Sequence, residues 1–358
     1  MDIHQATRAY ELWLSKQMPL IPADLRLKHQ RMDQSALAFL RATFYRWAQR
    51  WPQVCPELAT APVVLGVGDL HLENFGTWRD TEGRLVWGVN DFDEACQLPY
   101  PADLVRLAVS AQLAVHENRL VCDLATISEG ILTGYREAIE QGGSPLVLAE
   151  HHRWLRDVAK SNLSDPVAYW QKLGQWRNVG KAVPLEVKEM LRQALPGSAL
   201  AFRVVHRQAG LGSLGRRRFT MLAHWSGGLI AREAKELAPS AWHWEKGAHS
   251  RNKLLYFQAI EQAIRVADPF VRLHGRWVVR RLAPDCSRIE LGATSKQKDP
   301  VKLFHAMGWE TANIHLGIGQ AVRRLLKDLK GRPCEWLRKA AAAMAKDTLA
   351  DWETWRAK

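Results

Sequence analysis

The sequence predicts an α+β fold built from two parts, because its predicted elements and its charges divide the 358 residues in the same way. Helical patterns dominate both ends of the chain, and short strand patterns occupy the middle. Residues 199–285 hold fifteen Lys and Arg against six Asp and Glu, so +9 of the net charge of +13 lies there. We therefore expect a helix-rich part over residues 1–198 and 286–358 and a small strand-rich part over residues 199–285.

The helix-rich part is predicted to begin with an amphipathic helix over residues 31–50, where Leu37, Leu40, Phe44 and Trp47 recur at helical spacing. The elements that follow are, in order, strands over Val63–Val67 and Leu85–Val89, a helical region from Ala102 to about Leu195, and a linker at Pro196-Gly197-Ser198. After the middle segment the chain is predicted to be helical again from Lys302 onward, with a break at Gly331-Arg332-Pro333.

The strand-rich part is predicted to contain three consecutive strands, then a helix and a fourth strand. These are, in order, AFRVVHRQ (201–208), RRFTMLAHW (217–225), GLIAREAKEL (228–237), a helix over residues 253–267 and a strand over Arg276–Leu282. Glycines occur in both connections between the first three strands, which is typical of turns.

Composition excludes several classes of protein. The five cysteines, Cys55, Cys96, Cys122, Cys286 and Cys334, are scattered and never at CxxC spacing, which argues against a disulfide framework or a cysteine zinc site and predicts a cytoplasmic protein. The first thirty residues lack the pattern of a secretory signal, and no stretch reaches 18 apolar residues, so we expect no membrane partner. The net charge of +13 predicts an acidic ligand, which is either phosphate, nucleic acid or an anionic surface.

Polar side chains follow two of the predicted strands. The motifs GDLHLENFG and NDFDE supply Asp69, Asn74, Asp91 and Asp93. In-line phosphoryl transfer needs a carboxylate that orients the acceptor hydroxyl, together with oxygen ligands that hold Mg²⁺. Three carboxylates on adjacent strands would repel one another without a cation, so we favour a catalytic site over separate turn caps. The candidate catalytic carboxylate is Asp69, and the candidate metal ligands are Asn74, Asp91 and Asp93.

A binuclear metallophosphoesterase is the competing chemistry, because Asp69-Leu70-His71 is similar to the opening Asp-x-His of those enzymes. They also need a Gly-Asp-x-x-Asp and a Gly-Asn-His motif, and neither occurs downstream. The remaining histidines show no metal-ligand spacing tied to a carboxylate strand. This alternative is therefore disfavoured, and the role of His71 stays open.

Residues 210–215, GLGSLG, match the G-x-G-x-x-G pattern between two predicted strands. Because a strand and not a helix follows, the pattern argues against a Rossmann dinucleotide site and for a hairpin folded over phosphates. Lys235 stands twenty residues after the hairpin on the next predicted strand; it is either an exposed strand lysine or a ligand of the α- and β-phosphates. The candidate nucleotide-binding residues are Gly210, Gly212, Ser213, Gly215 and Lys235, with Glu261 as ion-pair partner of the lysine and Glu245 and Glu236 as rivals.

The run GDLHLENFG followed by NDFDEA resembles an uncharacterised bacterial family of kinase-like proteins, known only as a domain of unknown function. RMDQSALAFLRATFYRW, the GLGSLG hairpin, AREAKELAPS and MGWETANIHLGIG extend the resemblance from about residue 31 to residue 319. The wider resemblance is to the protein kinase and aminoglycoside phosphotransferase superfamily, which implies a two-lobed fold that uses ATP and Mg²⁺. It implies Asp69 as the catalytic carboxylate, Asn74 and Asp91 as metal ligands and Lys235 as the phosphate lysine.

Two departures from the superfamily pattern matter. The glycine loop and its lysine precede the catalytic loop in ordinary kinases but follow it here by more than a hundred residues, which implies a circularly permuted order. The run Asn-Asp-Phe-Asp-Glu stands in place of Asp-Phe-Gly, so Asp91 fits the metal position best, while Asp93 could share or replace that role.

The sequence thus leads to the hypothesis of an Mg-ATP-dependent phosphotransferase that acts on an unidentified hydroxyl-bearing acceptor. An AMP transferase on the same scaffold and a non-catalytic nucleotide- or anion-binding protein remain alternatives. Nucleic-acid binding by the basic segment lacks the support of a recognition helix or an aromatic platform. We expect residues from about 144 to 198 to line the acceptor pocket, because substrate elements in such folds are helical additions.

Overall fold

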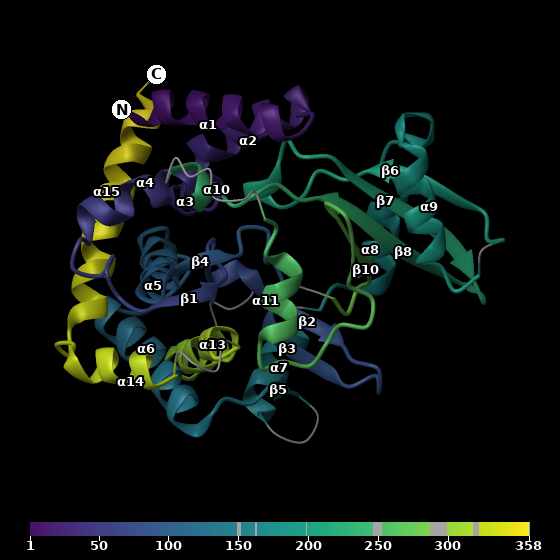
Figure 1. Cartoon of the computed structure of the whole chain (residues 1–358). Coiled ribbons are helices and arrows are strands. Elements are labelled where there is room, and N and C mark those ends of the chain that lie inside the picture. The colour runs from purple at the N-terminus through teal and green to yellow at the C-terminus, as the bar shows by residue number, and fades with distance from the viewer. Residues whose placement is uncertain are drawn as a thin grey trace.

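The computed structural model of the chain describes residues 1–148, 152–161, 163–197, 199–245, 253–286, 299–317 and 322–357. Over these residues the protein combines helices with antiparallel strands, which confirms the α+β class at this coarse level. Figure 1 shows a larger helical part and, to one side of it, a five-stranded sheet. In the described part of the chain no helix is both long and apolar enough to cross a membrane.

Several short helices occupy the N-terminal region, where the sequence predicted one continuous helix over residues 31–50. They are α1 (Ile3–Gln17), α2 (Pro22–Gln34), α3 (Ala36–Ala42) and α4 (Phe44–Val54). A continuous helix is wrong because the backbone is extended at Ser35, which caps α3 by accepting from Ala38 N at 3.0 Å, and leaves the helical conformation again at Thr43. The four apolar residues that predicted the helix are nonetheless all buried in the main core.

Two small sheets lie within the helical part. β1 (Val63–Gly66) pairs with β4 (Cys96–Pro99), and β2 (Phe75–Arg79), β3 (Leu85–Val89) and β5 (Leu146–Val147) form a sheet in the order β2–β3–β5. β1 and β3 confirm the two predicted strands, whereas the other three strands were not predicted. A backbone hydrogen bond from Asn90 N to Asn74 O (3.0 Å) holds together the chain segments that follow β1 and β3.

The main core forms around α5 (Pro101–His116), α6 (Leu124–Gln141) and α13 (Pro300–His315). α6 and α13 approach closely at Gly134 and Gly308, where an added Cβ would lie 1.9 Å from His305 O and 2.1 Å from Ile131 O. Only glycine permits this backbone contact. α14 (Val322–Gly331) and α15 (Trp336–Arg356) follow, separated at the predicted break. α15 runs beside α1, where His4 stacks on Trp355 at 4.9 Å between ring centres (Figure 1).

The strand-rich segment forms an antiparallel sheet in the order β6–β7–β8–β10–β9. Its strands are β6 (Phe202–His206), β7 (Arg218–Trp225), β8 (Gly228–Glu236), β9 (Arg272–His274) and β10 (Trp277–Leu282). The four predicted strands are confirmed, and β9 was not predicted. The predicted helix over residues 253–267 is confirmed only as the shorter α11 (Tyr256–Gln262), with α10 (Ala241–Glu245) before it.

Helices that precede this sheet in the chain cover both of its faces. Three helices lie directly before the sheet in the chain, α7 (Arg153–Ser161), α8 (Pro166–Gly174) and α9 (Leu185–Gln193), and the last two cover its faces. α9 packs on the face that carries Met221, and α8 packs through Leu173 on the opposite face, beside Leu222. Both helices fall in the segment 1–198 that the sequence assigns to the helix-rich part. Ser198, at the predicted boundary, lies outside the described residues. The division into two parts stays a prediction.

Candidate functional site

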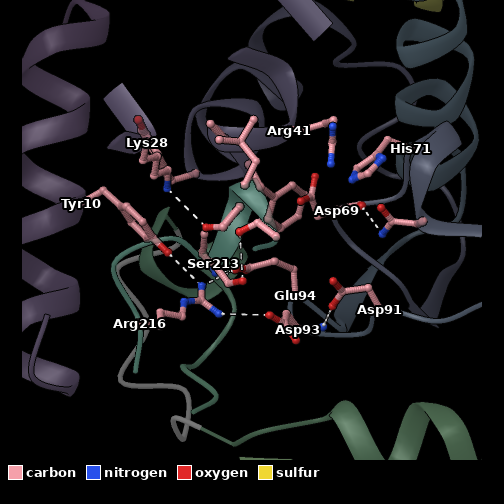
Figure 2. Close-up of a pocket in the computed structure, with 18 residues that line it drawn as sticks. Tyr10, Lys28, Arg41, Asp69, His71, Asp91, Asp93, Glu94, Ser213 and Arg216 are labelled. Atoms are coloured by element: carbon pink, nitrogen blue, oxygen red, sulfur yellow. Dashed lines mark hydrogen bonds and ion pairs between the residues drawn. The ribbon is translucent and has the colours of Figure 1, made fainter. Parts of the chain in front are cut away.

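The loops after β1 and β3 and the hairpin after β6 meet in one place, and the end of β8 lies behind the loop after β3. The loops and the hairpin surround a small cavity of about 40 Å³ (Figure 2). The predicted site residues that line this cavity are Asp69, Asn74, Asp91, Asp93, Gly210, Gly212 and Ser213. Lys235 lies behind Asp91 and Asp93, whereas Gly215 and Glu261 do not line the cavity.

Asp69 is held by a buried arginine that the sequence analysis did not single out. Its Oδ1 accepts from Arg106 Nε at 2.9 Å, and the Arg106 guanidinium, which is 0% exposed, lies 5.0 Å from the ring centres of Phe44 and Trp47. Asn74 Nδ2 donates to the backbone oxygen of Asp69 at 2.8 Å. Burial raises the pKa of Asp69 to about 6, although Arg106 opposes this shift, so the carboxyl group titrates close to neutrality.

A second buried carboxylate fixes the loop that presents this candidate catalytic group. Asp103, in the first turn of α5, accepts from Val67 N at 2.7 Å and Gly68 N at 2.9 Å. The same carboxylate lies 3.0 Å from His315 Nε2 in α13. Gly68 has a φ of +81°, and an added Cβ there would lie 2.3 Å from Glu94 O. The loop therefore requires glycine directly before the catalytic candidate.

Lys235 binds the two carboxylates that follow β3. Its Nζ lies 3.3 Å from Asp91 Oδ1 and forms a closer ion pair with Asp93, and its side chain is 2% exposed. Burial lowers the pKa of Lys235 and raises the pKa of Asp93. The opposite charges of the two groups work against both shifts, so each group offsets part of the cost of burying the other. The second oxygen of this carboxylate, Asp93 Oδ1, is buried and accepts no hydrogen bond.

The oxygens of Asn74, Asp91 and Asp93 suit a hard cation such as Mg²⁺. The unsatisfied Asp93 Oδ1 fits a bound cation best, because a buried acceptor without a partner costs free energy. Two features weigh against a preformed site. Lys235 already pairs with both carboxylates, and within the described ranges no group of three or more His, Cys, Asp or Glu is placed to hold a metal. A cation here would depend on the amide oxygen of Asn74 and would compete with the lysine.

The expected ion pair between Lys235 and Glu261 is not formed. Glu261 is exposed on α11, which packs against α13. Of the two rivals, Glu236 accepts from Arg217 Nε at 2.6 Å, and Glu245 ends α10. The prediction is wrong because it assumed that the helix after the lysine strand faces the lysine, whereas the carboxylates after β3 take that place.

The predicted glycine hairpin forms a tight 3-10 turn, Leu211–Ser213, that rests on the loop after β1. An added Cβ at Gly212 would lie 3.2 Å from Asp69 Oδ2 and 3.0 Å from Arg41 O. Gly210 has a φ of +74°, a conformation that favours glycine. The glycines therefore let the hairpin approach the candidate catalytic carboxylate directly.

The hairpin is also tied to α2. Ile21 N, just before the helix, donates to Gly215 O at 2.8 Å, and Lys28 Nζ donates to Gly212 O at 3.3 Å. Leu211 is buried in a cluster with apolar residues of α2 and α3. The N-terminal helices and the hairpin together close the small cavity on this side, a role that sequence reasoning did not assign to α2.

Arg216, directly after the hairpin, reaches the cavity beside Glu94. Its Nη2 donates to Glu94 Oε1 at 2.7 Å, and its Nη1 lies 3.8 Å from Asp93 Oδ2. Nε and Nη1 of this buried guanidinium have no hydrogen-bond partner. Glu94 also accepts from Ala241 N at 2.7 Å, so it connects the hairpin to α10. The run of three arginines after the glycines was the sequence signal that could have located this contact.

A second ion cluster lies on the sheet face that carries Lys235. Glu233, which is 0% exposed, accepts from Arg218 at 2.7 Å and from Arg207 and Arg280 at 2.8 Å each. Burial opposes ionisation of Glu233, but the three guanidinium groups lower its pKa well below the usual range. This carboxylate is therefore charged at neutral pH.

A larger cavity of about 530 Å³ adjoins the small one, and Arg41 and Gly210 line both. Its lining comes from the five-stranded sheet, the β2–β3 hairpin, α8 and α11. The aromatic side chains are Trp78, Phe92, Tyr169, Trp176 and Tyr256, and the basic ones include Lys172, Arg207, Arg218, Arg265, Arg280 and Arg281. Residues of α8 thus place part of the segment 144–198 against a ligand-sized space.

Residues 20–168 match a protein family described as "Uncharacterized protein conserved in bacteria (DUF2252)". The matched segment contains Asp69, Asn74, Asp91 and Asp93 but ends before the glycine hairpin and Lys235. Neither the curated proteins nor the solved structures contain a match to the chain. The resemblance to an uncharacterised bacterial family is thus supported over the segment that contains both carboxylate motifs.

Proposed function

We propose that this protein is an Mg²⁺- and ATP-dependent phosphotransferase with a two-lobed, kinase-like arrangement in permuted order. One observation carries the proposal: Asp69 and Asp91, which follow two different strands, line a single cavity, and Lys235 on a third strand contacts Asp91 from behind. Carboxylates and a lysine in this combination are what phosphoryl transfer to a hydroxyl group requires. The permuted order is compatible with it, since the lysine lies 144 residues after Asp91 in the chain and still reaches that carboxylate.

Each residue then has a defined task. Asn74, Asp91 and Asp93 would hold Mg²⁺, which neutralises phosphate charge when bound. Lys235 would exchange its carboxylate partners for the α- and β-phosphates. Asp69 would orient the acceptor hydroxyl and accept its proton, and a pKa of about 6 suits a group that does so near neutral pH.

The larger cavity is the better place for the nucleoside. Its volume of about 530 Å³ falls within the roughly 300–1,000 Å³ of ordinary ligand sites, whereas about 40 Å³ admits only a few atoms. The half-buried Tyr169 and Trp176 offer aromatic side chains to a base, and Arg41, which lines both cavities, offers charge to a phosphate. A nucleotide there would direct its phosphates past Gly210, where the two cavities meet.

Binding and transfer can be tested on the same protein. The melting temperature should rise by a few degrees with Mg²⁺ and ATP, and less with ATP and a chelator, since a ligand at about 100 times its Kd stabilises by about 2.7 kcal/mol. Label from γ-labelled ATP should move to an acceptor or to water, whereas transfer of an α-label would instead indicate an AMP transferase. The absence of any metal-dependent shift at millimolar ATP would contradict the proposal.

A non-catalytic nucleotide-binding protein is the second candidate, and the closure of the small cavity favours it. Gly212 lies directly against Asp69, and both carboxylates after β3 are already paired with Lys235. On this alternative, ATP shifts the melting temperature, but neither label is transferred in the presence of a panel of hydroxyl compounds. The two labelled nucleotides therefore distinguish all three functions.

A further inference from the structure

Lys28, on α2, differs from the other buried cations at the small cavity. Arg106, Arg216 and Lys235 each pair with a carboxylate of the site. Lys28 is 4% exposed, and no carboxylate among the described residues lies within ion-pair distance of it. Its ammonium has three donors, and the structure assigns one of them, to Gly212 O at 3.3 Å. Because a buried charge without an ion-pair partner is costly, the position of Lys28 favours an anion beside it.

Further donors surround the same end of the cavity. Figure 2 shows Lys28 and Tyr10 at one end and Asp91 at the other. Arg216 belongs to the Lys28 end, since its Nη2 lies 3.5 Å from Tyr10 Oη, and its Nε and Nη1 have no hydrogen-bond partner. The cavity thus presents unused N–H donors beside Lys28 and Tyr10, and Arg216 connects this end to Asp93, whose Oδ2 lies 3.8 Å from Arg216 Nη1.

Each carboxylate that lines the cavity is already in an ion pair, although Asp91 and Asp93 share one lysine. The pairs are Asp69 with Arg106, Asp91 and Asp93 with Lys235, and Glu94 with Arg216. These four carboxylates and three cations leave one negative charge, which Lys28 balances without an ion pair, so in the described part of the chain no carboxylate takes up its N–H donors.

The volume limits what the anion can be. A buried water needs about 10–15 Å³, so about 40 Å³ accommodates about three waters or one small tetrahedral group. We infer that the Lys28 end of the small cavity binds a tetrahedral oxyanion through Lys28 and Arg216, with Tyr10 as a third donor. Its assignment as a phosphoryl group rests on the proposed function. The group then comes either from the terminal phosphate of ATP or from a phosphate on the acceptor.

Sulfate and orthophosphate, added without nucleotide or metal, are the probes. Titration calorimetry of the full-length protein at low salt should detect binding, and Lys28→Met should weaken it about 10- to 100-fold, as expected for losing a hydrogen bond to a charged group. Lys28→Arg should retain most of the affinity. Lys16→Met, on the exposed side of α1, is the matched control and should bind as the wild-type protein does.

Two results would overturn the inference: no binding of either anion by the wild-type protein, or equal affinity in Lys28→Met. Lys28→Met should fold, because it removes a buried charge without an ion-pair partner and keeps most of the side-chain volume. Tyr10→Phe is a second variant that changes no charge and deletes one donor. It should weaken sulfate binding several-fold, and unchanged binding would remove Tyr10 from the site.

Nucleotides separate the two sources of the phosphoryl group. Mg-ADP would leave the terminal position open, whereas a non-hydrolysable ATP analogue would fill it. Displacement of sulfate by the ATP analogue but not by ADP assigns the Lys28 end to the terminal phosphate, and sulfate binding alongside the ATP analogue assigns it to the acceptor. Binding of sulfate through Lys28 without any nucleotide binding would contradict the proposed function and leave the oxyanion site standing.

Discussion

The ion cluster around Glu233 and the small cavity around Asp69 are both built from buried charges, but they are satisfied to different degrees. Glu233 accepts hydrogen bonds from three arginines at 2.7–2.8 Å. In the small cavity, Asp93 Oδ1 accepts no hydrogen bond, and two nitrogens of Arg216 donate none. Because native proteins satisfy nearly all buried polar atoms, the incomplete cluster indicates a place for a ligand, and the complete one indicates a structural role.

This difference separates stability from function in a testable way. Removing a charge from the satisfied cluster should leave buried partners without a counter-charge and destabilise the fold. Removing a carboxylate from the crowded cavity relieves repulsion and should mainly affect ligand binding and turnover. The variants that follow each change one of the two regions.

Glu233→Gln should have the largest effect. It should lower the free energy of unfolding by about 3–5 kcal/mol, because the buried Arg218 and the half-buried Arg207 and Arg280 lose their shared counter-charge. Urea or guanidinium denaturation measures this change. Glu189→Gln, on the exposed surface of α9, is the control and should change stability by less than about 0.5 kcal/mol. Wild-type stability in Glu233→Gln would mean that the cluster has no structural role.

Asp91→Asn should lower Mg²⁺-dependent turnover of ATP by about 10²- to 10³-fold, a size typical of a lost electrostatic contact in an active site. Stability should stay equal or rise, because Asp91 raises the pKa of Asp93 by repulsion and Lys235 keeps its pair with Asp93. Initial rates with labelled ATP and denaturation curves of the same preparation measure both effects. Glu57→Gln, on the surface, is the control. Full turnover in Asp91→Asn would remove this residue from the catalytic site.

Sequence reasoning located those parts of the site that lie within short motifs. Alternating or continuous apolar runs followed by polar residues were sufficient to place Asp69 and Asp91 at strand ends. Arg106 was missed because it lies in a helix of apolar residues, and its contact with Asp69 spans 37 positions of sequence. Lys28 was missed because a lysine in a polar helix is typically exposed; it is buried only where α2 docks on the hairpin, 184 positions away.

For the fold as well, local patterns were predicted and features that depend on long-range contacts were missed. The equally short β1 and β3 were predicted because each is a continuous apolar run between turn residues, whereas β2, β4 and β9 mix apolar and polar residues and β5 has only two residues. The breaks at Ser35 and Thr43 depend on local side-chain hydrogen bonds that compete with helix continuation. The packing of α8 and α9 on the sheet depends on tertiary contacts, which the local pattern does not contain.

Lys28 gives the cavity a pH dependence that the complete cluster should lack. Burial is the largest effect and lowers the pKa of Lys28 to about 8. The positive charge of Arg216 also lowers this pKa, whereas the negative charges of Glu11, Glu94 and Asp69 raise it. Because the protonated ammonium binds the anion, sulfate affinity should fall about tenfold per pH unit above about pH 8. Sulfate is a suitable probe because its own charge does not change in this range.

The stability of the protein should change in the opposite direction over the same range. Between about pH 8 and 10.5 the folded protein has released the Lys28 proton and the unfolded chain still binds it, so the free energy of unfolding rises with pH. Lys28→Met should remove both effects, which separates them from the titration of cysteines and tyrosines elsewhere. A sulfate affinity that is constant up to pH 10 would contradict the assignment of Lys28 as the anion ligand.

Gly212→Ala should have a small effect on stability and still distinguish the two regions. The new Cβ would meet Asp69 Oδ2 and Arg41 O at 3.2 and 3.0 Å, contacts that a shift of a few tenths of an ångström relieves, so we expect a cost of about 1 kcal/mol. Gly228→Ala, whose Cβ would meet no atom within 4 Å, is the control. Since the methyl group enters the space where ATP phosphates would pass, the Mg-ATP shift in melting temperature should disappear in Gly212→Ala and persist in Gly228→Ala. An unchanged shift in both variants would mean that the hairpin closes the cavity without contacting the nucleotide.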